Sequence, residues 1–391
     1  MRISVPFCKR PGSSSFFRSA VAVAGLFFIT ASDAALTAQD PVDAILKIER
    51  GGQGVVEATA AAEQLAKQGV ELDVLLSKAS AANPVSKNWI LSIAQSIADR
   101  RPAAARQSLE RLLGDQQADG ELRYWALDRL SERRSEVREK LLDGRTDDSS
   151  LDIRYEAIEL AIKKLPAIEA AKENDSIKRQ LVASYELLLD SARLPDQIFS
   201  INAKLKELES EVDLRKHFGF ISSWHVIGPF DNRNQAGFDV VYPPEAEYVQ
   251  MAKVDVMSRY PGKAGEVTWQ SAATDKPDGL VNLNPILSNE KGAAAYAYAV
   301  VKSAVEGPCQ VRFGTANANK VWVNGQESTT NNVYHTGSPI DQYIGSAKLS
   351  RGLNTVLVKV CQNEQTEEWA QDFAFKLRFS DTTGRAIELT Q

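Results

Sequence analysis

Residues 295–301 read AYAYAVV, and this stretch decides the fold of the second half of the chain. Tyr296, Tyr298 and Val300 occupy every second position, and smaller side chains fill the positions between them. Because successive side chains of a β-strand point to opposite faces, this alternation predicts a strand. Residues 373–379 (FAFKLRF) alternate in the same way and predict a second strand.

Turn signals separate further strands. Residues 321–325 (VWVNG) run into an Asn-Gly pair, which favours a tight hairpin because both residues tolerate a positive φ. Residues 352–360 (GLNTVLVKV) begin with a turn and continue with valines at every second position. We therefore expect about nine to eleven strands over roughly 170 residues, arranged as a sandwich or jelly roll.

The first half of the chain has a different composition. Residues 41–215 hold 25 Leu but only 6 aromatic residues and 7 Gly, whereas residues 216–391 hold 8 Leu, 19 aromatic residues and 14 Gly. Sequence rich in Leu and poor in Gly favours helices, and aromatic residues with frequent Gly favour strands and turns. The composition predicts a multidomain protein with an all-α domain over 41–215 and an all-β domain over 216–391.

An internal repeat points to the arrangement of the helices. Residues 121–127 (ELRYWAL) reappear 31 positions later as residues 152–158 (DIRYEAI), and a looser echo places Tyr185 30 positions after Tyr155. A fixed period near 30 is typical of stacked helical hairpins. On these residues, positions 81–192 resemble HEAT-like repeats, which implies a spacer or a surface that binds a protein partner. An irregular helical bundle is the alternative.

The second half carries its own resemblance. Through residues 321–325 and 352–360, positions 222–385 resemble the galactose-binding-like jelly-roll domains, such as the sugar-binding domain of family-two glycoside hydrolases. Residues 224–230 (WHVIGPF) and 237–245 (GFDVVYPPE) are similar to the opening of uncharacterised secreted bacterial proteins with such domains. The resemblance implies carbohydrate or protein binding without catalysis, and the barrel domain that performs hydrolysis in those enzymes has no counterpart in this sequence.

The N-terminus has the pattern of an export signal over residues 1–34. Basic residues precede twelve uncharged apolar residues at 20–31, and small residues follow, which favours cleavage after Ala34 or Ala38. Twelve helical residues would span only about 18 Å of a hydrocarbon core about 30 Å thick. We therefore expect an exported, periplasmic or extracellular protein without a membrane span after signal removal, and an uncleaved anchor is the alternative.

Charge and motifs exclude several functions. A net charge of −5 and a pI near 5.5 argue against a nucleic-acid partner, which would require a basic surface. The sequence contains no phosphate-binding loop, dinucleotide fingerprint or zinc-protease motif. With three cysteines and three histidines, it offers little material for a metal site. The prediction is a protein that is not an enzyme and has no cofactor and no metal.

The candidate ligand site lies on the β domain. If Val321 and Val323 face the core, alternation exposes the indole of Trp322 beside Asn324, and an exposed indole can stack on sugar C–H groups. Residues 327–339 are expected to form a long polar loop that carries Tyr334 and His335. The predicted ligand-binding residues are Trp322 and Asn324 of the hairpin and Tyr334 and His335 of the loop.

Three smaller expectations concern ions and cysteines. Jelly rolls often hold a structural calcium, for which oxygens of Asp231, Asn232 and Asp239 would be the available ligands, although the sequence predicts no metal site. The acidic pair at residues 147–148 lacks a calcium-loop pattern and is expected to be a solvated connector. No disulfide is expected between Cys309 and Cys361, because strand parity directs them to opposite faces of their sheets.

The sequence supports two main hypotheses about function. The first is a non-catalytic exported protein whose helical spacer carries a jelly-roll module that binds a glycan, such as a cell-envelope polysaccharide, or a cell-surface partner. The second is a structural or assembly protein that makes only protein–protein contacts and binds no sugar. An undetected hydrolase is the weakest hypothesis, because no group of residues supplies a nucleophile and its base.

Overall fold

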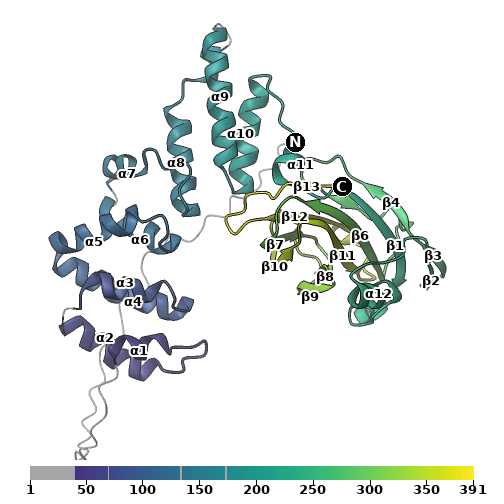
Figure 1. Cartoon of the computed structure of the whole chain (residues 1–391), viewed down its shortest axis with the longest axis horizontal. Helices are drawn as coiled ribbons and strands as arrows, with labels where there is room; N and C mark the ends of the chain where they lie inside the picture. The colour runs from purple at the N-terminus through teal and green to yellow at the C-terminus, as the bar shows by residue number, and fades with distance from the viewer. Residues whose placement is uncertain (1–39, 69, 133, 172–173) are drawn as a thin grey trace, which may run out of the picture.

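The chain folds into a helical N-terminal part and an antiparallel β-sandwich, as predicted (Figure 1). The computed structural model describes residues 40–391 apart from residues 69, 133 and 172–173. The predicted signal at residues 1–34 and both predicted cleavage positions lie outside the described residues. Among the helices that are described, none is both long and apolar enough to cross a bilayer.

Prolines and short polar side chains mark where the helices begin. Pro84 occupies the first turn of its helix, and the side chain of Asn83 accepts hydrogen bonds from the backbone amides of Val85 and Ser86. Asp119 caps a later helix through the amide of Leu122. The helices are α1 (Pro41–Leu46), α2 (Val55–Gln68), α3 (Leu72–Ala79), α4 (Pro84–Arg100), α5 (Pro102–Gly114), α6 (Gly120–Ser131), α7 (Ser135–Leu142), α8 (Leu151–Lys164), the short η1 (Ile168–Ala171), α9 (Asp175–Ser191), α10 (Pro195–Glu207) and α11 (Leu214–Phe218).

The two sharp copies of the repeat occupy equivalent places in α6 and α8. From the aliphatic residue onward, the two copies share one pattern of buried, half-buried and exposed side chains. Ala126 and Ala157 are both buried, which lets neighbouring helices approach closely. The looser echo in α9 does not continue this pattern, since Leu187, which corresponds to Ala157, is 72% exposed.

The repeated arginines hold the connector between α7 and α8. Arg123 forms a bidentate ion pair with Asp148, at 2.5 and 2.7 Å, and also donates to the backbone oxygen of Leu113 at the end of α5. Arg154 donates to the backbone oxygens of Asp147 and Asp148. Because Asp148 is fully buried, the expectation of a solvated acidic connector is wrong for this residue. Burial raises the pKa of Asp148, but hydrogen bonds from Arg123, Ser150 and Gln116 outweigh it and lower the pKa below its ordinary value.

Two sheets form the sandwich. The larger sheet has the strand order β4-β1-β6-β11-β8-β9, with β13 paired to β6, and the smaller has the order β10-β7-β12-β5; a separate hairpin pairs β2 with β3. The strands are β1 (Ser223–Asp231), β2 (Arg259–Gly262), β3 (Gly265–Thr268), β4 (Gln270–Ala273), β5 (Val281–Asn282), β6 (Ala293–Ser303), β7 (Gly307–Gly314), β8 (Ala318–Val323), β9 (Gln326–Asn331), β10 (Tyr343–Leu349), β11 (Gly352–Gln362), β12 (Ala374–Ser380) and β13 (Leu389–Thr390).

The core between the sheets follows the predicted alternation. Most alanines of β6 face the smaller sheet, whose β12 contributes Phe375, Leu377 and Phe379 to the same cluster. Small side chains on one sheet thus leave room for large rings on the other. The opposite face of β12, which carries Lys376 and Arg378, is buried as well. Lys376 forms an ion pair with Asp278, and Arg378 forms one with Asp341.

A second layer covers the outer face of the larger sheet. It consists of η2 (Arg233–Phe238), α12 (Pro243–Met251) and the β2–β3 hairpin, which lie against one side of the sandwich in Figure 1. Lys359 of β11 is fully buried beneath this layer, and its ammonium lies 3.0 Å from a carboxylate oxygen of Glu245 in α12. The hydroxyl of Tyr296 donates to the same carboxylate. This network connects α12 to the centre of the sheet.

The helical part and the sandwich are joined through a packed junction. Phe218 at the end of α11 is buried in one cluster with residues of α9 and α10. Its backbone oxygen accepts a hydrogen bond from Arg378 of β12, whose guanidinium lies over the Phe218 ring. The boundary predicted at residues 215–216 falls inside α11. The change in composition therefore coincides with a helix that packs against both parts.

Candidate functional site

Several loops gather at one end of the sandwich. Asp231 at the end of β1 and Gln362 at the end of β11 both pair with Ala293 at the start of β6. The loop between β9 and β10 and the loop between β11 and β12 begin at the same end (Figure 1). Loops on a rigid sheet are where binding groups concentrate, so this loop end is the candidate site.

Trp322 does not belong to this site, and its predicted exposure is wrong. Alternation does place the indole opposite Val321 and Val323, which face the core between the sheets. However, the indole is only 3% exposed, because the second layer covers the outer face of the sheet. It packs in one cluster with Tyr248 of α12 and with Leu357, its cross-strand partner. Trp322 therefore cannot offer a stacking face to a sugar.

The side chain of Asn324 forms hydrogen bonds that hold its own hairpin in place. Its φ of 50° places it in the left-handed region that the turn requires. Its side-chain amide donates to the side chain of Asn354 at 2.8 Å, and its side-chain oxygen accepts from the backbone amide of Thr355 at 2.9 Å. The hairpin lies at the end of β8 and the loop end at the start of β8, so the structure does not bring Asn324 together with Tyr334 and His335.

Tyr334 and His335 lie at the loop end. The expected loop over 327–339 is shorter at its start, because residues up to Asn331 form the edge strand β9, whose polar composition gives no hydrophobic alternation. Tyr334 is half-buried, and its hydroxyl accepts a hydrogen bond from the side chain of Asn232 at 3.3 Å. Burial raises the pKa of Tyr334 to about 12, so its hydroxyl stays protonated at neutral pH.

His335 has a ring nitrogen without a hydrogen-bond partner among the described residues. Its φ of 57° is a left-handed conformation, in which the imidazole approaches the loop between β11 and β12. The ring lies 4.8 Å from the ring of Trp369 at an angle of 80°, an edge-to-face contact. Its Nε2 is buried and finds no hydrogen-bond partner among the described residues. A buried nitrogen of this kind is one that a bound hydroxyl or water could satisfy.

Trp369 is the aromatic residue that the loop end presents to solvent. It lies in the short helix η3 (Glu368–Ala370) and is 61% exposed. Alternation of side chains can predict which face of a strand is exposed, so it applies to Trp322 in β8. It makes no prediction for Trp369, which lies outside the strands. A signal for Trp369 was nevertheless present, since residues 362–372 (QNEQTEEWAQD) contain no other large apolar side chain. A lone tryptophan in a polar run has few partners with which to form a core.

Two of the three residues considered as calcium ligands, Asp231 and Asn232, bond to neighbouring protein groups. The carboxylate of Asp231 forms hydrogen bonds of 2.9 and 3.0 Å to Nε of Arg233. The side chain of Asn232 donates to Tyr334 and to the backbone oxygen of Gln362. Over the described part of the chain, no three His, Cys, Asp or Glu side chains are grouped so that they could hold a metal ion.

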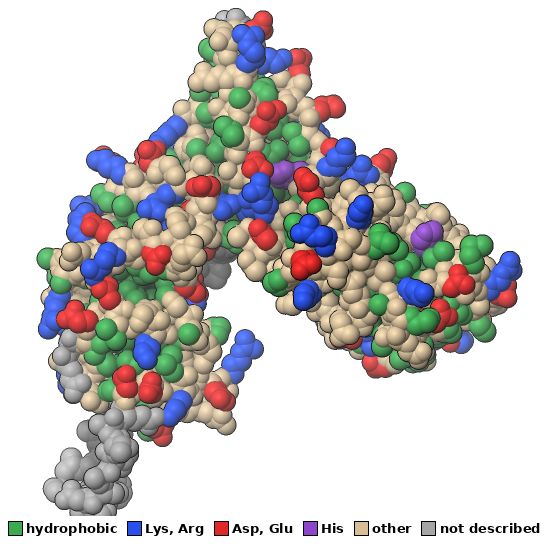
Figure 2. All heavy atoms as spheres, viewed as in Figure 1, with side chains coloured by type: hydrophobic (Ala, Val, Ile, Leu, Met, Phe, Trp, Pro, Cys, Tyr) green, Lys and Arg blue, Asp and Glu red, His purple; other side chains and the backbone are tan. Residues whose placement is uncertain are grey.

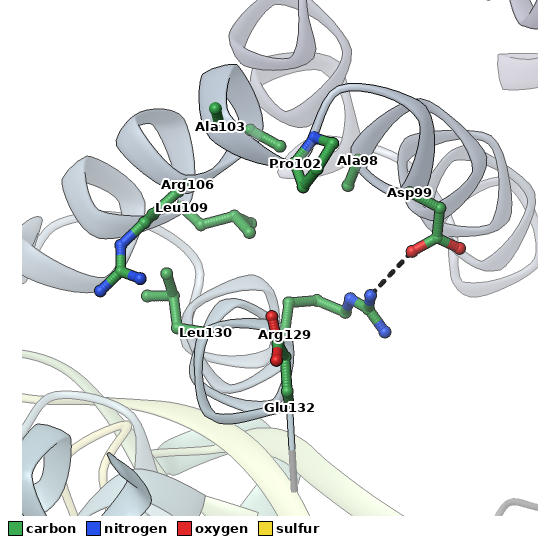
Figure 3. A pocket seen from close by; sticks show the side chains of 10 residues that line it. Ala98, Asp99, Pro102, Ala103, Arg106, Leu109, Arg129, Leu130 and Glu132 are labelled. Atoms are coloured by element: carbon green, nitrogen blue, oxygen red, sulfur yellow. Dashed lines mark hydrogen bonds and ion pairs between the residues drawn. The ribbon is translucent and has the colours of Figure 1, made fainter. Parts of the chain in front are cut away.

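Two hollows lie elsewhere on the molecule. On the helical part, a cavity of about 400 Å³ has an apolar wall that includes Pro102, Leu109 and Leu130, and Arg129 pairs with Asp99 at its rim at 2.8 Å (Figure 3). On the sandwich, a groove of about 640 Å³ runs beside the exposed His225 of β1.

Comparison with known proteins gives no further guide to function. No protein-family model matches the chain, and no curated protein is significantly similar to it in sequence.

Proposed function

We propose that this chain is an exported, non-catalytic binding protein, in which a HEAT-like helical spacer carries a galactose-binding-like module that binds a neutral glycan at the loop end. One observation supports the site above all. Trp369 is exposed at the loop end, and His335 contacts its ring edge-on. An aromatic face stacks on the C–H groups of a sugar, and nearby polar atoms bond its hydroxyls.

The surroundings of Trp369 supply such polar atoms. Tyr334 offers a protonated hydroxyl, and His335 offers a buried Nε2 that has no hydrogen-bond partner among the described residues. The carboxylates of Glu367 and Glu368 lie next to Trp369 in the chain and are exposed, so they can accept hydrogen bonds from hydroxyl groups. One stacked ring contributes about 1 kcal/mol, so the affinity should be weak, roughly micromolar to millimolar.

A glycan array with the full chain tests this function, followed by titration of the retained glycan into variants. Trp369→Ala should weaken binding several-fold, because it removes the stacking face. Leu353→Ala is the matched control, since Leu353 is also exposed but begins β11 at the opposite end of the sandwich. Equal affinities for the two variants would contradict the site. Retention of no glycan would instead favour an assembly protein that makes only protein–protein contacts.

A further inference from the structure

A small cavity lies at the junction between the helical part and the sandwich. Its volume is about 210 Å³, below the roughly 300 Å³ at which cavities begin to hold drug-sized ligands. Four elements surround it: the end of α9, the start of α10, the last turn of α11, and β12 with the segment that follows it. In Figure 2, basic, acidic and histidine side chains lie close together at this junction. A ligand here would touch both parts of the chain.

The charges that line the cavity are unbalanced. The lining contains four permanently cationic side chains against two carboxylates. The cationic side chains are those of Arg193, Lys216, Arg378 and Arg385, and the carboxylates are those of Asp190 and Glu388. Arg385 forms a long ion pair with Asp190, at 3.4 Å, and Arg378 is neutralised by Asp341 from outside the cavity. His217 also lines the cavity, but burial lowers its pKa, which favours the neutral imidazole.

Two of these cations lack a carboxylate partner. Within the described residues, neither Arg193 nor Lys216 has a carboxylate within ion-pair distance. Arg193 uses Nη1 to cap the backbone oxygens of Asp190 and Ala192, but its Nε is buried and has no hydrogen-bond partner. Burial and the nearby charges of Arg154 and Arg385 lower the pKa of Arg193 to about 10, although the carboxylates of Asp190 and Asp381 oppose the shift. The cavity therefore places several guanidinium and ammonium groups close together, where their positive charges repel one another.

We propose that this cavity binds a single tetrahedral oxyanion, the phosphate or sulfate of a free ion or of a small sugar ester. An oxyanion would accept hydrogen bonds from the guanidinium of Arg193 and the ammonium of Lys216. Its negative charge would also offset the repulsion between the guanidinium groups. Because Arg193 comes from the helical part and Arg385 from the sandwich, the anion would also tie the two parts together. This inference does not depend on glycan binding at the loop end.

The test is titration of the full chain by calorimetry with inorganic phosphate, inorganic sulfate and glucose 6-phosphate, with chloride at equal ionic strength as the reference. Saturable binding of phosphate or sulfate supports a site for the free ion, and binding of glucose 6-phosphate alone supports a site for the ester. Heat no larger than that from chloride with all three ligands would overturn the proposal.

Variants locate the site. Lys216→Gln should weaken the affinity roughly threefold, because it removes one exposed charge at the rim. Arg193→Gln should weaken it roughly tenfold, because it removes charge-assisted hydrogen bonds. Since Arg193 also caps α9, the thermal midpoint of that variant without anion must be measured. Lys216 needs no such control, because within the described part of the chain its only hydrogen bond to a side chain is made by its backbone amide.

Lys253→Gln is the matched control, since Lys253 is an exposed lysine just beyond α12 on the second layer. It should bind anions as the unchanged chain does. Equal losses of affinity for Lys216→Gln and Lys253→Gln would mean that the anions act only through net charge, and would overturn the cavity as their site.

Discussion

Trp322 and Trp369 are residues of the same type, but their surroundings bury the first and leave the second exposed. Trp322 lies in a strand beneath a second layer, whereas Trp369 lies in the short helix η3 within a polar run and is 61% exposed. Alternation along β8 is enough to assign Trp322 to the outer face. It cannot show that residues 233–268, which are distant in sequence, cross that face and bury the ring.

Replacing Trp322 therefore tests stability. Trp322→Ala should lower the free energy of unfolding by about 3–5 kcal/mol, the usual effect of deleting a buried tryptophan. Trp369→Ala should change it by less than about 0.5 kcal/mol, as expected for an exposed side chain. Denaturant titrations of both variants measure the difference. A stable Trp322→Ala variant would mean that the second layer does not hold the indole in solution.

The two cysteines of the sandwich provide a second test at this scale. Both are free and buried, Cys309 in the core between the sheets and Cys361 beneath the second layer. Burial raises the pKa of Cys309 to about 11 and that of Cys361 to about 12, so neither forms a thiolate near neutral pH. A thiol reagent at pH 8 should react with neither residue in the folded chain and with both after unfolding without reductant. Absence of both thiols after unfolding would reveal a disulfide.

At the scale of elements, the repeated arginines explain why the motif recurs. Arg123 and Arg154 both reach the connector before α8, where Arg123 neutralises a carboxylate and Arg154 satisfies backbone oxygens. A spacing of 31 residues was sufficient to predict equivalent helices. It was not sufficient to predict the buried ion pair, because the partner Asp148 lies in a polar connector that resembles a solvated loop.

Removing one partner of this ion pair should be costly. Arg123→Ala leaves the carboxylate of Asp148 buried without its main partner, so the free energy of unfolding should fall by about 3–5 kcal/mol. Arg129→Ala is the matched control in the same helix, where the more exposed pair with Asp99 should contribute at most about 1 kcal/mol. Thermal and denaturant unfolding compare the two. Equal losses would show that the connector relaxes and lets water reach Asp148.

The strands were more predictable than the layer that covers them. Tyr296 and Tyr298 share a face as the alternation predicts, and β8 runs into its Asn-Gly turn. The residues of α12 and η2 carry no such regular pattern, since they pack on a sheet that is already formed. The same difference limits prediction of the candidate site. Tyr334 and His335 lie at the loop end, but their role in binding stays a prediction, and Trp369 has no strand or helix periodicity, so that only its isolation in a polar run marks it.

At the scale of the whole molecule, the junction should make the two parts unfold together. Phe218 and Phe220 are buried with α9 and α10, and Arg378 bonds to the backbone of Phe218 from the sandwich. Phe218→Ala should therefore destabilise the chain by about 3–5 kcal/mol and split one unfolding transition into two. Limited proteolysis of this variant should cut between α10 and α11 faster than in the unchanged chain. An unaltered single transition would show that the junction contributes little to cooperativity.

The burial of the larger sheet on both faces has a consequence for the exchange of its amide hydrogens with solvent. β6 and β11 each have a paired strand on both sides, a core on one face and, along much of their length, the second layer on the other. Their backbone amide hydrogens can exchange with deuterated solvent only when the second layer, the flanking strands and the core open together. The amides of Tyr296 and Val358 should thus exchange at the rate of global unfolding, while those of the edge strand β9 exchange through local fraying.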